Sequence, residues 1–515
     1  MLTPAQEGLA EPPQTAILFV QDDTPVFPNP PRYVVGTPNN ATVTIIPANS
    51  LPTVTVVANG TASENGPTPA TFTFTRTGNA IGDLFVFYQL PTGTGRALLG
   101  WDYTLSQMPP MVTIANGQTT AVLNLTPVQD SRYEGTETVE LDLLPNANYL
   151  VGSPSSAIMS ISDNDSPPPS NLMYTITAIG QPGPISLSWG MGINGATPAP
   201  TVVGMFQPVS GNQHVHGFSW LNGTLTDLGA LESGGAAQSW ALGVNDSGLV
   251  VGYATSDVGT FYPVTWSSGV IGVLATLGFG DNQATAISAS GHIVGFCDNN
   301  FDTQRAVFWS DPSTPNDMGC LDRHNPPLKA SYANGVNVDG RIVGKAMIEA
   351  DNVSFHGFRT AGGVFFNIDP AKDDLGTLFG GVSFNSEADG INDLDEVVGG
   401  SATMSGQFHA YWKAGNTGIN DGYVDLGVLS GDNYSVALAI NTTGTTVGYS
   451  RNPSTGVQRA FVSYNDGIMH DLITKVSNPT GWTLATAQAV NASGWIVGWG
   501  YTYGYARAFV LAPNQ

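Results

Sequence analysis

The sequence predicts an all-β protein in which a β-sandwich is followed by a seven-bladed β-propeller. Three observations lead to this prediction. A phrase ending in Val-Gly recurs seven times at a period of about 49 residues. The part of the chain before these repeats holds short segments of alternating apolar and polar residues, and no long stretch has the period of an α-helix.

Residues 1–47 resemble the end of a domain. The segment Tyr33–Ile45 (YVVGTPNNATVTI) matches Tyr149–Ile161 (YLVGSPSSAIMSI) at an offset of 116 residues, and an apolar strand precedes each of them, at Thr15–Val20 and Thr138–Leu143. Two strands cannot bury their own apolar face. We therefore expect a preceding domain of which only the C-terminal part is present, and a longer protein whose export signal lies upstream.

The complete copy of this domain covers about residues 52–165. Strand-like alternation between turn residues predicts a β-sandwich of six or seven strands. The predicted strands are Phe72–Arg76, Leu84–Tyr88, Val112–Ile114, Ala121–Thr126, Thr138–Leu143 and Ile158–Ile161.

Five short motifs follow one another along this domain. They are Ala62–Gly66 (ASENG), Thr75–Gly78 (TRTG), Gly100–Tyr103 (GWDY), Glu134–Glu137 (EGTE) and Ser162–Asp165 (SDND). Their order resembles the Calx-β domain. The resemblance implies a Calx-β-type sandwich that binds calcium through loop carboxylates at one end, since calcium takes six to eight hard oxygen ligands.

The resemblance implies six metal ligands: Glu64, Asp102, Asp130, Glu134, Asp163 and Asp165. Asp163 and Asp165 lie two residues apart in an acidic exit loop, and this spacing suggests a cation site even without the resemblance. Gln129, Ser131 and Asn164 stand where the Calx-β domains of sodium/calcium exchangers carry further carboxylates, so we expect fewer ions or weaker binding. Bound calcium would stiffen the join between modules. The alternative is an acidic loop that only caps turns and stays solvated.

A proline-rich linker, residues 166–172, follows the sandwich. It begins with Ser166–Ser170 (SPPPS), which predicts a semi-rigid spacer.

Residues 173–511 contain the seven repeats. A full phrase such as Ala241–Tyr253 (ALGVNDSGLVVGY) predicts a β-hairpin, because Asn and Gly tolerate the left-handed backbone of a tight turn. A triplet beginning with His or Arg and an Asp-Leu-Gly segment, for example His409–Tyr411 and Asp425–Gly427, supply two more strands, which completes a propeller blade. The closing glycines are Gly204, Gly252, Gly295, Gly344, Gly399, Gly448 and Gly498.

The two ends of the array predict how the ring closes. The seventh repeat has no Asp-Leu-Gly strand, whereas Tyr174–Gly180 (YTITAIG) precedes the first hairpin with nothing before it to pair with. Pairing the two would remove two exposed sheet edges, so we expect a closed ring. An open β-solenoid is the alternative, because a spacing of 43 to 55 residues does not measure curvature.

The repeated phrase resembles the HAF-type extracellular repeats of bacterial secreted proteins, which are named for a His-Ala-Phe triplet. The resemblance covers about residues 173–511 and depends on seven copies in phase. It implies a secreted β-repeat module and supplies no chemistry.

Composition limits the partners. The chain has 16 Lys and Arg against 40 Asp and Glu, a formal charge of -24, which disfavours nucleic acid and anionic lipid. The chain contains no run of 18 apolar residues, the feature that would predict a membrane-spanning helix. We expect an extracellular or cell-surface protein whose partners are calcium and a glycan or protein ligand; oligomeric state is left open.

No catalytic residue is predicted. His216, His356 and His409 occupy a repeat position that arginine takes elsewhere, so a role in packing or inter-blade bonding is expected of them. Cys297 and Cys320 lie two strands apart in the predicted blade, which disfavours a disulfide.

Two functions remain. The first, which we expect, is a non-catalytic binding or adhesion protein with a calcium-binding sandwich and a ligand-binding propeller. The alternative is a propeller carbohydrate-active enzyme, a lyase or hydrolase, with its site on one face; a long insertion at Asp369–Leu375 in the fourth repeat would favour it. The tryptophans that follow the triplets predict blade core or stacking surfaces. They are Trp220, Trp266, Trp309 and Trp412.

Overall fold

The computed structural model confirms the all-β prediction. Strands dominate, together with a short 3-10 helix η3 (Leu472–Lys475). Within the described part of the chain, no helix combines the length and apolar character that a membrane span needs. The residues that the structure describes are 14–20, 35–45, 51–91, 96–97, 99, 102–107, 110–129, 135–164, 172–180, 187–207, 214–231, 236–322, 328–348, 353–361, 367–378, 384–415, 422–464 and 467–514.

The chain divides into two compact units. The first comprises residues 1–130 and 134–165, and the second comprises residues 131–133 and 166–515. In the first unit, β1 (Gln14–Phe19) and β2 (Asn40–Ile45) form an antiparallel pair. The remaining strands of this unit build a sandwich.

The β1–β2 pair repeats the register of two sandwich strands. Gln14 lies opposite Ile45, just as Glu137 of β10 (Glu137–Leu143) lies opposite Ile161 of β12 (Ser156–Ser162). The internal repeat read from the sequence is therefore also a repeat of strand pairing. The assignment of residues 1–47 to a preceding domain stays a prediction.

The sandwich consists of two five-stranded sheets, in the orders β4-β12-β10-β6-β8 and β11-β3-β5-β9-β7. Its core is filled by alternate residues; in β5, for example, Phe72 and Phe74 are fully buried while the threonines between them are half-buried. The other strands are β3 (Thr53–Asn59), β4 (Ala62–Ser63), β5 (Ala70–Thr77), β6 (Leu84–Gln89), β7 (Tyr103–Leu105), β8 (Met111–Ile114), β9 (Thr120–Pro127) and β11 (Leu150–Val151).

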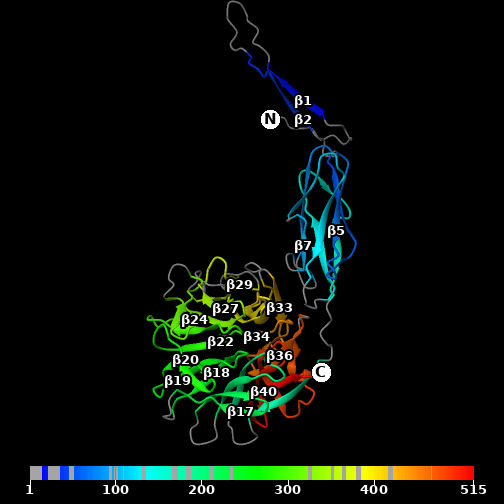
Figure 1. Ribbon diagram of the computed structural model, residues 1–515. Coiled ribbons are helices and arrows are strands. Elements are labelled where there is room, and N and C mark those ends of the chain that lie inside the picture. Colours follow the sequence, from blue (N-terminus) through cyan, green and yellow to red (C-terminus); the bar gives the residue numbers. More distant parts are fainter. Residues whose placement is uncertain are drawn as a thin grey trace, which may run out of the picture. The chain divides into compact units, whose positions relative to one another are not determined.

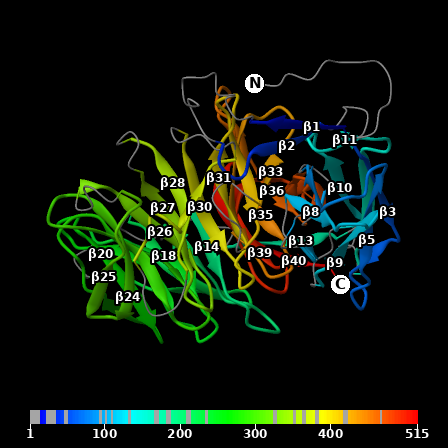
Figure 2. The same ribbon diagram turned by 90° about the horizontal axis from the view of Figure 1, so that it is seen from above.

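The second unit is a propeller whose described strands form seven four-stranded blades around a common axis (Figures 1 and 2). Blades V and VI are joined by one parallel pair, Phe408 with Tyr434. The strands of each blade are given from the inner strand outwards. Blade I contains β14 (Ser188–Ile193), β15 (Val202–Phe206), β16 (His216–Leu221) and β17 (Thr224–Asp227), and blade II contains β18 (Ser239–Val244), β19 (Val250–Thr255), β20 (Phe261–Ser267) and β21 (Val270–Val273). Blade III contains β22 (Asn282–Ile287), β23 (Ile293–Asp298), β24 (Gln304–Asp311) and β25 (Thr314–Asp317).

Blades IV to VII continue the same order. Blade IV contains β26 (Ser331–Val336), β27 (Ile342–Met347), β28 (Phe355–Arg359) and β29 (Asp374–Gly376), and blade V contains β30 (Ser386–Ile391), β31 (Val397–Ala402), β32 (Phe408–Lys413) and β33 (Tyr423–Gly427). Blade VI contains β34 (Tyr434–Ile440), β35 (Thr446–Asn452), β36 (Val457–Ser463) and β37 (His470–Asp471). Blade VII contains β38 (Trp482–Val490), β39 (Ile496–Thr502), β40 (Tyr505–Pro513) and β13 (Tyr174–Ile179).

The ring closes through β13, as the sequence predicted. This strand pairs with β40 in antiparallel register from Tyr174 opposite Pro513 to Ile179 opposite Ala508. Each inner strand also contacts the inner strands of both neighbouring blades all the way around, including β14 against β38. The alternative of an open solenoid was therefore wrong.

The Val-Gly motif is explained by a bulge in every inner strand. The register between the first two strands slips by one residue, for example between Ala241 and Gly243. This brings a backbone oxygen against the motif glycine: a Cβ on Gly252 would lie 1.9 Å from the carbonyl oxygen of Trp240, and the other six motif glycines meet the equivalent oxygen at 1.9 to 2.0 Å. Only glycine fits there.

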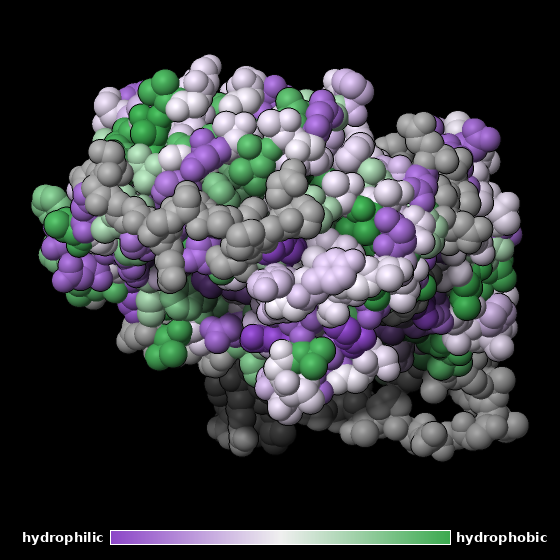
Figure 3. Space-filling view, turned by 90° about the horizontal axis from the view of Figure 1, so that it is seen from below, coloured by the Kyte–Doolittle hydropathy of each residue, from purple (hydrophilic) through white to green (hydrophobic). Residues whose placement is uncertain are grey.

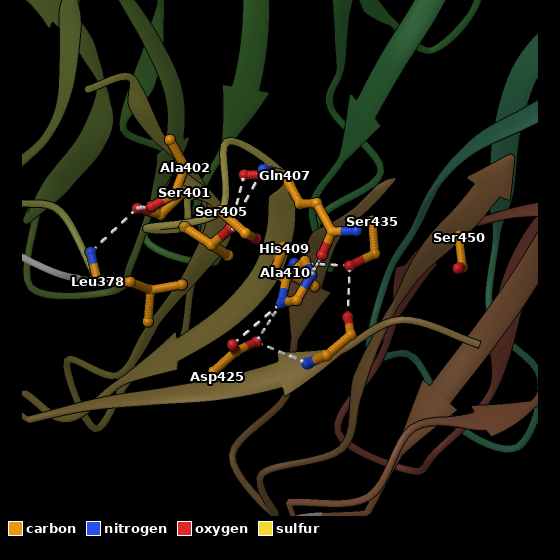
Figure 4. Close-up of polar contacts among 12 residues, drawn as sticks. Leu378, Ser401, Ala402, Ser405, Gln407, His409, Ala410, Asp425, Ser435 and Ser450 are labelled. Carbon is orange, nitrogen blue, oxygen red and sulfur yellow. Dashed lines mark hydrogen bonds and ion pairs between the residues drawn. The ribbon is translucent and has the colours of Figure 1, made fainter. Parts of the chain in front are cut away.

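A hydroxyl from each of several inner strands links neighbouring blades. Ser435 Oγ of blade VI accepts the backbone N–H of Ala410 at 2.7 Å and donates to the carbonyl oxygen of Gly427 at 2.6 Å, both in blade V (Figure 4). Ser331 makes the same two bonds to blade III, at 2.9 and 2.6 Å. These serines form inter-blade hydrogen bonds, whereas the described bonds of the triplet residues His356 and His409 to Asp374 and Asp425 stay within one blade.

Asparagines in the turns after the inner strands form a second inter-blade link. The side-chain amide of Asn392 donates to the backbone carbonyl oxygen of Asn441 at 2.9 Å. In the same way, the Asn441 side chain donates to the carbonyl oxygen of Asn491, and the Asn491 side chain donates to that of Asn194 in blade I, each at 2.9 Å. Asn194 then donates to the carbonyl oxygen of Asn245 at 3.2 Å. Because these groups are buried, their hydrogen bonds satisfy polar atoms that water cannot reach and link neighbouring blades.

Candidate functional site

Three of the predicted calcium ligands lie at one end of the sandwich. Glu64 follows β4 and donates its backbone N–H to Ser162 at 3.1 Å, which places it beside Asp163 at the end of β12. Asp102 precedes β7, whose first residue pairs with Pro127. The register of β9 on β5 and of β5 on β3 brings the end of β9 to the same end of the domain.

The three side chains differ in their surroundings. Glu64 and Asp102 are only 3% and 6% exposed. Asp163 accepts the backbone N–H of Gly135 at 2.7 Å. Asp130, Glu134 and Asp165 lie outside the described residues, as do residues 166–171 of the predicted linker. Within the described ranges, no three or more His, Cys, Asp or Glu side chains are grouped as a metal site would require.

The triplet histidines bond within their own blades. His409 Nδ1 lies 3.0 Å from the Asp425 carboxylate (Figure 4). His356 pairs with Asp374 at 2.9 Å. Arg305 Nε takes the same place with respect to Asp317, at 3.0 Å. The pair ties the third strand to the fourth in each of these blades. The histidines are therefore structural, as expected, but they do not bond between blades.

Several other sequence-level candidates belong to the core. The tryptophans after the triplets are 1% to 8% exposed, so they are blade core rather than stacking surfaces. Cys297 and Cys320 are buried and free. The Asp369–Leu375 insertion closes on itself: the backbone N–H of Asp369 donates to the Asp373 carboxylate at 2.7 Å, and burial raises the pKa of Asp373 to about 6.

A cavity of about 360 Å³ lies on the propeller axis and is lined by all seven inner strands. At each bulge one side chain contributes to its wall. Four of these side chains are polar and three are apolar: Thr285, Asn334, Asp389, Gln488, Met191, Leu242 and Leu438. Asp389 is the charged group among them.

Charged residues that depart from the repeat gather beside Asp389. Lys345 follows a motif glycine where five other blades carry Met, Tyr, Phe or Trp and one carries Gly, and its Nζ lies 2.8 Å from Glu387 Oε2. Arg451 of blade VI places its guanidinium 4.1 Å from the ring centroid of Tyr434. We call Lys345, Glu387, Asp389, Tyr434 and Arg451 the blade IV–VI cluster.

The electrostatics of this cluster are unusual. Burial raises the pKa of the Asp389 carboxyl well above its ordinary value, and the charge of Glu387 raises it further, against the opposing effects of Lys345 and of a hydrogen bond from Asn334. Asp389 Oδ1 accepts that bond from Asn334 Nδ2 at 3.0 Å. The Asp389 Oδ2 atom is buried and has no hydrogen-bond partner. Burial lowers the pKa of Lys345, but the charge and hydrogen bond of Glu387, together with Asp389 and Tyr332, raise it above its ordinary value.

Aromatic pairs surround the axis on the face where the inner strands begin. Trp240 stacks on Tyr253 with ring centroids 4.6 Å apart, and Trp189 stacks on Trp499 at 5.2 Å. Tyr434 stacks on Phe408 at 5.2 Å. All six side chains are half-buried, so part of each remains accessible.

The hairpin tips on this face carry exposed apolar side chains. These are Val258, Phe301, Val353, Met404, Val457 and Tyr503, which are 52% to 89% exposed. They are spread over six blades. Figure 3 shows one side of the molecule, and on its coloured surface the hydrophobic residues are likewise scattered between polar ones. We call the side with the aromatic pairs and these tips the strand-start face.

The sequence did not single out this cluster. Its charged members come from three repeats, and their proximity depends on the bulges and on blade packing. Signals were nonetheless present: Lys345, Glu387 and Asp389 are charged at repeat positions that are apolar, small or uncharged in most blades.

Neither a protein-family model nor a curated protein matches the chain. Among solved structures, it is similar to the apo form of the Calx CBD1 domain, with 19% identity over 22% of this chain and 98% of that one, at a TM-score of 0.19. An arginine-to-alanine triple mutant of AofleA from Arthrobotrys oligospora shows 11% identity over 58% and 89%, at a TM-score of 0.27. A candidate carbohydrate binding protein from Bacteroides ovatus shows 9% identity over 68% and 93%, at 0.17. Likenesses this weak carry no argument about function.

Proposed function

We propose that this is a non-catalytic extracellular binding protein whose propeller binds a glycan on its strand-start face. The observation that supports the proposal is the set of half-buried aromatic pairs around the axis, next to the polar blade IV–VI cluster. A sugar ring has an apolar C–H face and a rim of hydroxyls, so it is bound by an aromatic face together with a few oriented polar groups.

The propeller fold requires neither feature. The blade cores are already filled by Trp266, Phe218, Phe358 and similar residues, all nearly or fully buried. The pair of Trp240 and Tyr253 lies outside these cores and keeps part of its surface in solvent. Exposed aromatic area of this kind is a cost in water that a bound ligand removes.

Glycan binding is tested with the full chain on an array of oligosaccharides, followed by calorimetry on the best ligand. We expect Trp240→Ala to weaken binding about tenfold, because one stacking partner of roughly 1.4 kcal/mol is lost. Phe85→Ala is the matched control, since Phe85 is an aromatic residue 48% exposed on the sandwich. Equal affinity in both variants, or no saturable binding of any oligosaccharide, would contradict the proposal.

We also propose that the sandwich binds calcium at the end that holds Glu64, Asp102 and Asp163. Two of these carboxylates are buried, and the third, Asp163, accepts the backbone N–H of Gly135 at 2.7 Å. All three supply the hard oxygen atoms that calcium prefers. Bound calcium would hold the loops of this end together and so stiffen the module.

Calcium binding is tested by a thermal melt of the full chain with and without calcium. At a calcium concentration 100 times the Kd, we expect about 2.7 kcal/mol of added stability for the sandwich. Asp163→Asn should remove most of this gain. Asp142→Asn, at the opposite end of β10, should leave it intact. A melt that calcium does not change would reject the site.

The alternative of a carbohydrate-active enzyme is favoured by one observation, the adjacent Glu387 and Asp389 with a raised pKa at Asp389. A lyase or hydrolase would shorten the glycan. Chromatography of the calorimetry samples after prolonged incubation separates the two functions, because a binding protein returns the oligosaccharide intact.

A further inference from the structure

Among the residues that the structure describes, Arg451 forms no ion pair with a carboxylate. Its Nε atom is buried and has no hydrogen-bond partner, and its described contact is the face of Tyr434. Arg459, in the next strand of the same blade, instead pairs with Asp432 at 2.8 Å and with Asp471 at 3.1 Å. Arg451 is half-buried and stacked on Tyr434, so its guanidinium is held in place without being neutralised by a described carboxylate.

The charges around Arg451 do not cancel it. Lys345 and Glu387 neutralise each other at 2.8 Å. Asp389 resists ionisation because it is buried beside Glu387. Where Asp389 is protonated, the cluster therefore carries a net positive charge in a chain whose formal charge is -24.

The geometry of the cluster also suits an oxyanion. A guanidinium presents a planar fork of N–H donors that pairs with two oxygens of a carboxylate or sulfate, and the aromatic ring beneath holds that plane in place. Asp389, on the cavity wall, is the neighbouring acidic group of the cluster, and its raised pKa limits repulsion of a bound oxyanion.

We infer that the blade IV–VI cluster selects glycans that carry an oxyanion group, a carboxylate or a sulfate, which Arg451 binds. This inference rests on the proposed glycan binding and adds the substrate class. The neighbouring aromatic rings would stack against the sugar rings, while the Arg451 guanidinium would donate hydrogen bonds to the carboxylate or sulfate.

The inference is tested by calorimetry on the full chain with four hexasaccharides: a polyuronate, the same polyuronate as its methyl ester, a sulfated galactan and a neutral galactan. We expect at least one acidic ligand to bind at least tenfold more tightly than its uncharged counterpart. Arg451→Gln should abolish this preference, so that acidic and uncharged hexasaccharides bind with similar affinity.

Two further variants separate charge from geometry. Arg451→Lys keeps the charge but not the planar fork, so it should restore only part of the preference. Lys372→Gln is the matched control, because Lys372 is a 76% exposed cation on the connection between the third and fourth strands, at the opposite end of its blade. It should bind like the wild type.

The outcomes distinguish the inference from the function beneath it. Preference for the polyuronate identifies a carboxylate, and preference for the sulfated galactan identifies a sulfate. Equal affinity for acidic and uncharged ligands, or a preference that survives in Arg451→Gln, overturns the inference and leaves glycan binding standing. If none of the four ligands and no array oligosaccharide binds, the proposed function itself fails.

Discussion

A chain that begins at residue 181 is expected to lose the cooperative melting of the propeller, whereas a chain that begins at residue 172 is expected to keep it. The two truncations differ by nine residues, which include the whole of β13. Without β13 the last blade has three strands, and both β40 and the neighbouring core are exposed to water.

The contacts of β13 explain the size of this effect. Tyr174 and Ile179 are fully buried, and Ile176 is 8% exposed. The carbonyl oxygen of Ile179 accepts a hydrogen bond from Ser188 Oγ of blade I at 3.0 Å, so the strand also joins the last blade to the first. At about 2 kcal/mol for each of these three buried side chains, the loss is about 6 kcal/mol, a large share of the stability of a typical domain.

Calorimetric melting and sedimentation velocity measure the outcome. The shorter chain should melt at a lower temperature with a broad transition, and should associate through its open edge. A synthetic peptide of residues 172–180 added in trans should restore part of the loss. If both truncated chains melt alike, β13 does not close the ring in solution.

The substitution Gly344→Ala should destabilise the propeller by more than about 3 kcal/mol. A Cβ at this position would lie 1.9 Å from the carbonyl oxygen of Tyr332 and 2.9 Å from Cε1 of Phe358. The backbone oxygen cannot move without breaking the bulge, and the bulge places Asn334 on the cavity wall.

Gly272→Ala is the matched control, because a Cβ there meets only the Thr265 hydroxyl, at 3.3 Å, and that hydroxyl can rotate. Chemical denaturation of both variants should separate them clearly. A loss in Gly344→Ala no greater than in Gly272→Ala would show that the inner strand tolerates a flatter register.

The ring could be predicted because its signals repeat. Each Val-Gly phrase reports the same hairpin, and a strand missing at one end matched a spare strand at the other, so Tyr174–Gly180 was paired correctly with the last blade. What the sequence did not reveal was why glycine is required: the clash at Gly344 is with a backbone oxygen of the adjacent strand, whose position depends on the slipped register.

The binding cluster could not be predicted for the opposite reason. Lys345, Glu387 and Arg451 each occur once, in different repeats, and a period-based comparison treats such departures as noise. Their proximity depends on which face of each strand meets the next blade. The histidines misled in the same way, because a shared repeat position does not say whether the partner lies in the same blade or the neighbouring one.

The closing strand also determines where neighbouring modules are attached. The backbone N–H of Asn514 donates to the carbonyl oxygen of Met173 at 2.8 Å, so the residues just before β13 and just after β40 lie side by side at blade VII. Any module joined before residue 172 or after residue 514 therefore hangs from one blade. Both attachment points lie at blade VII, so the outer surfaces of the other six blades are not used for attachment.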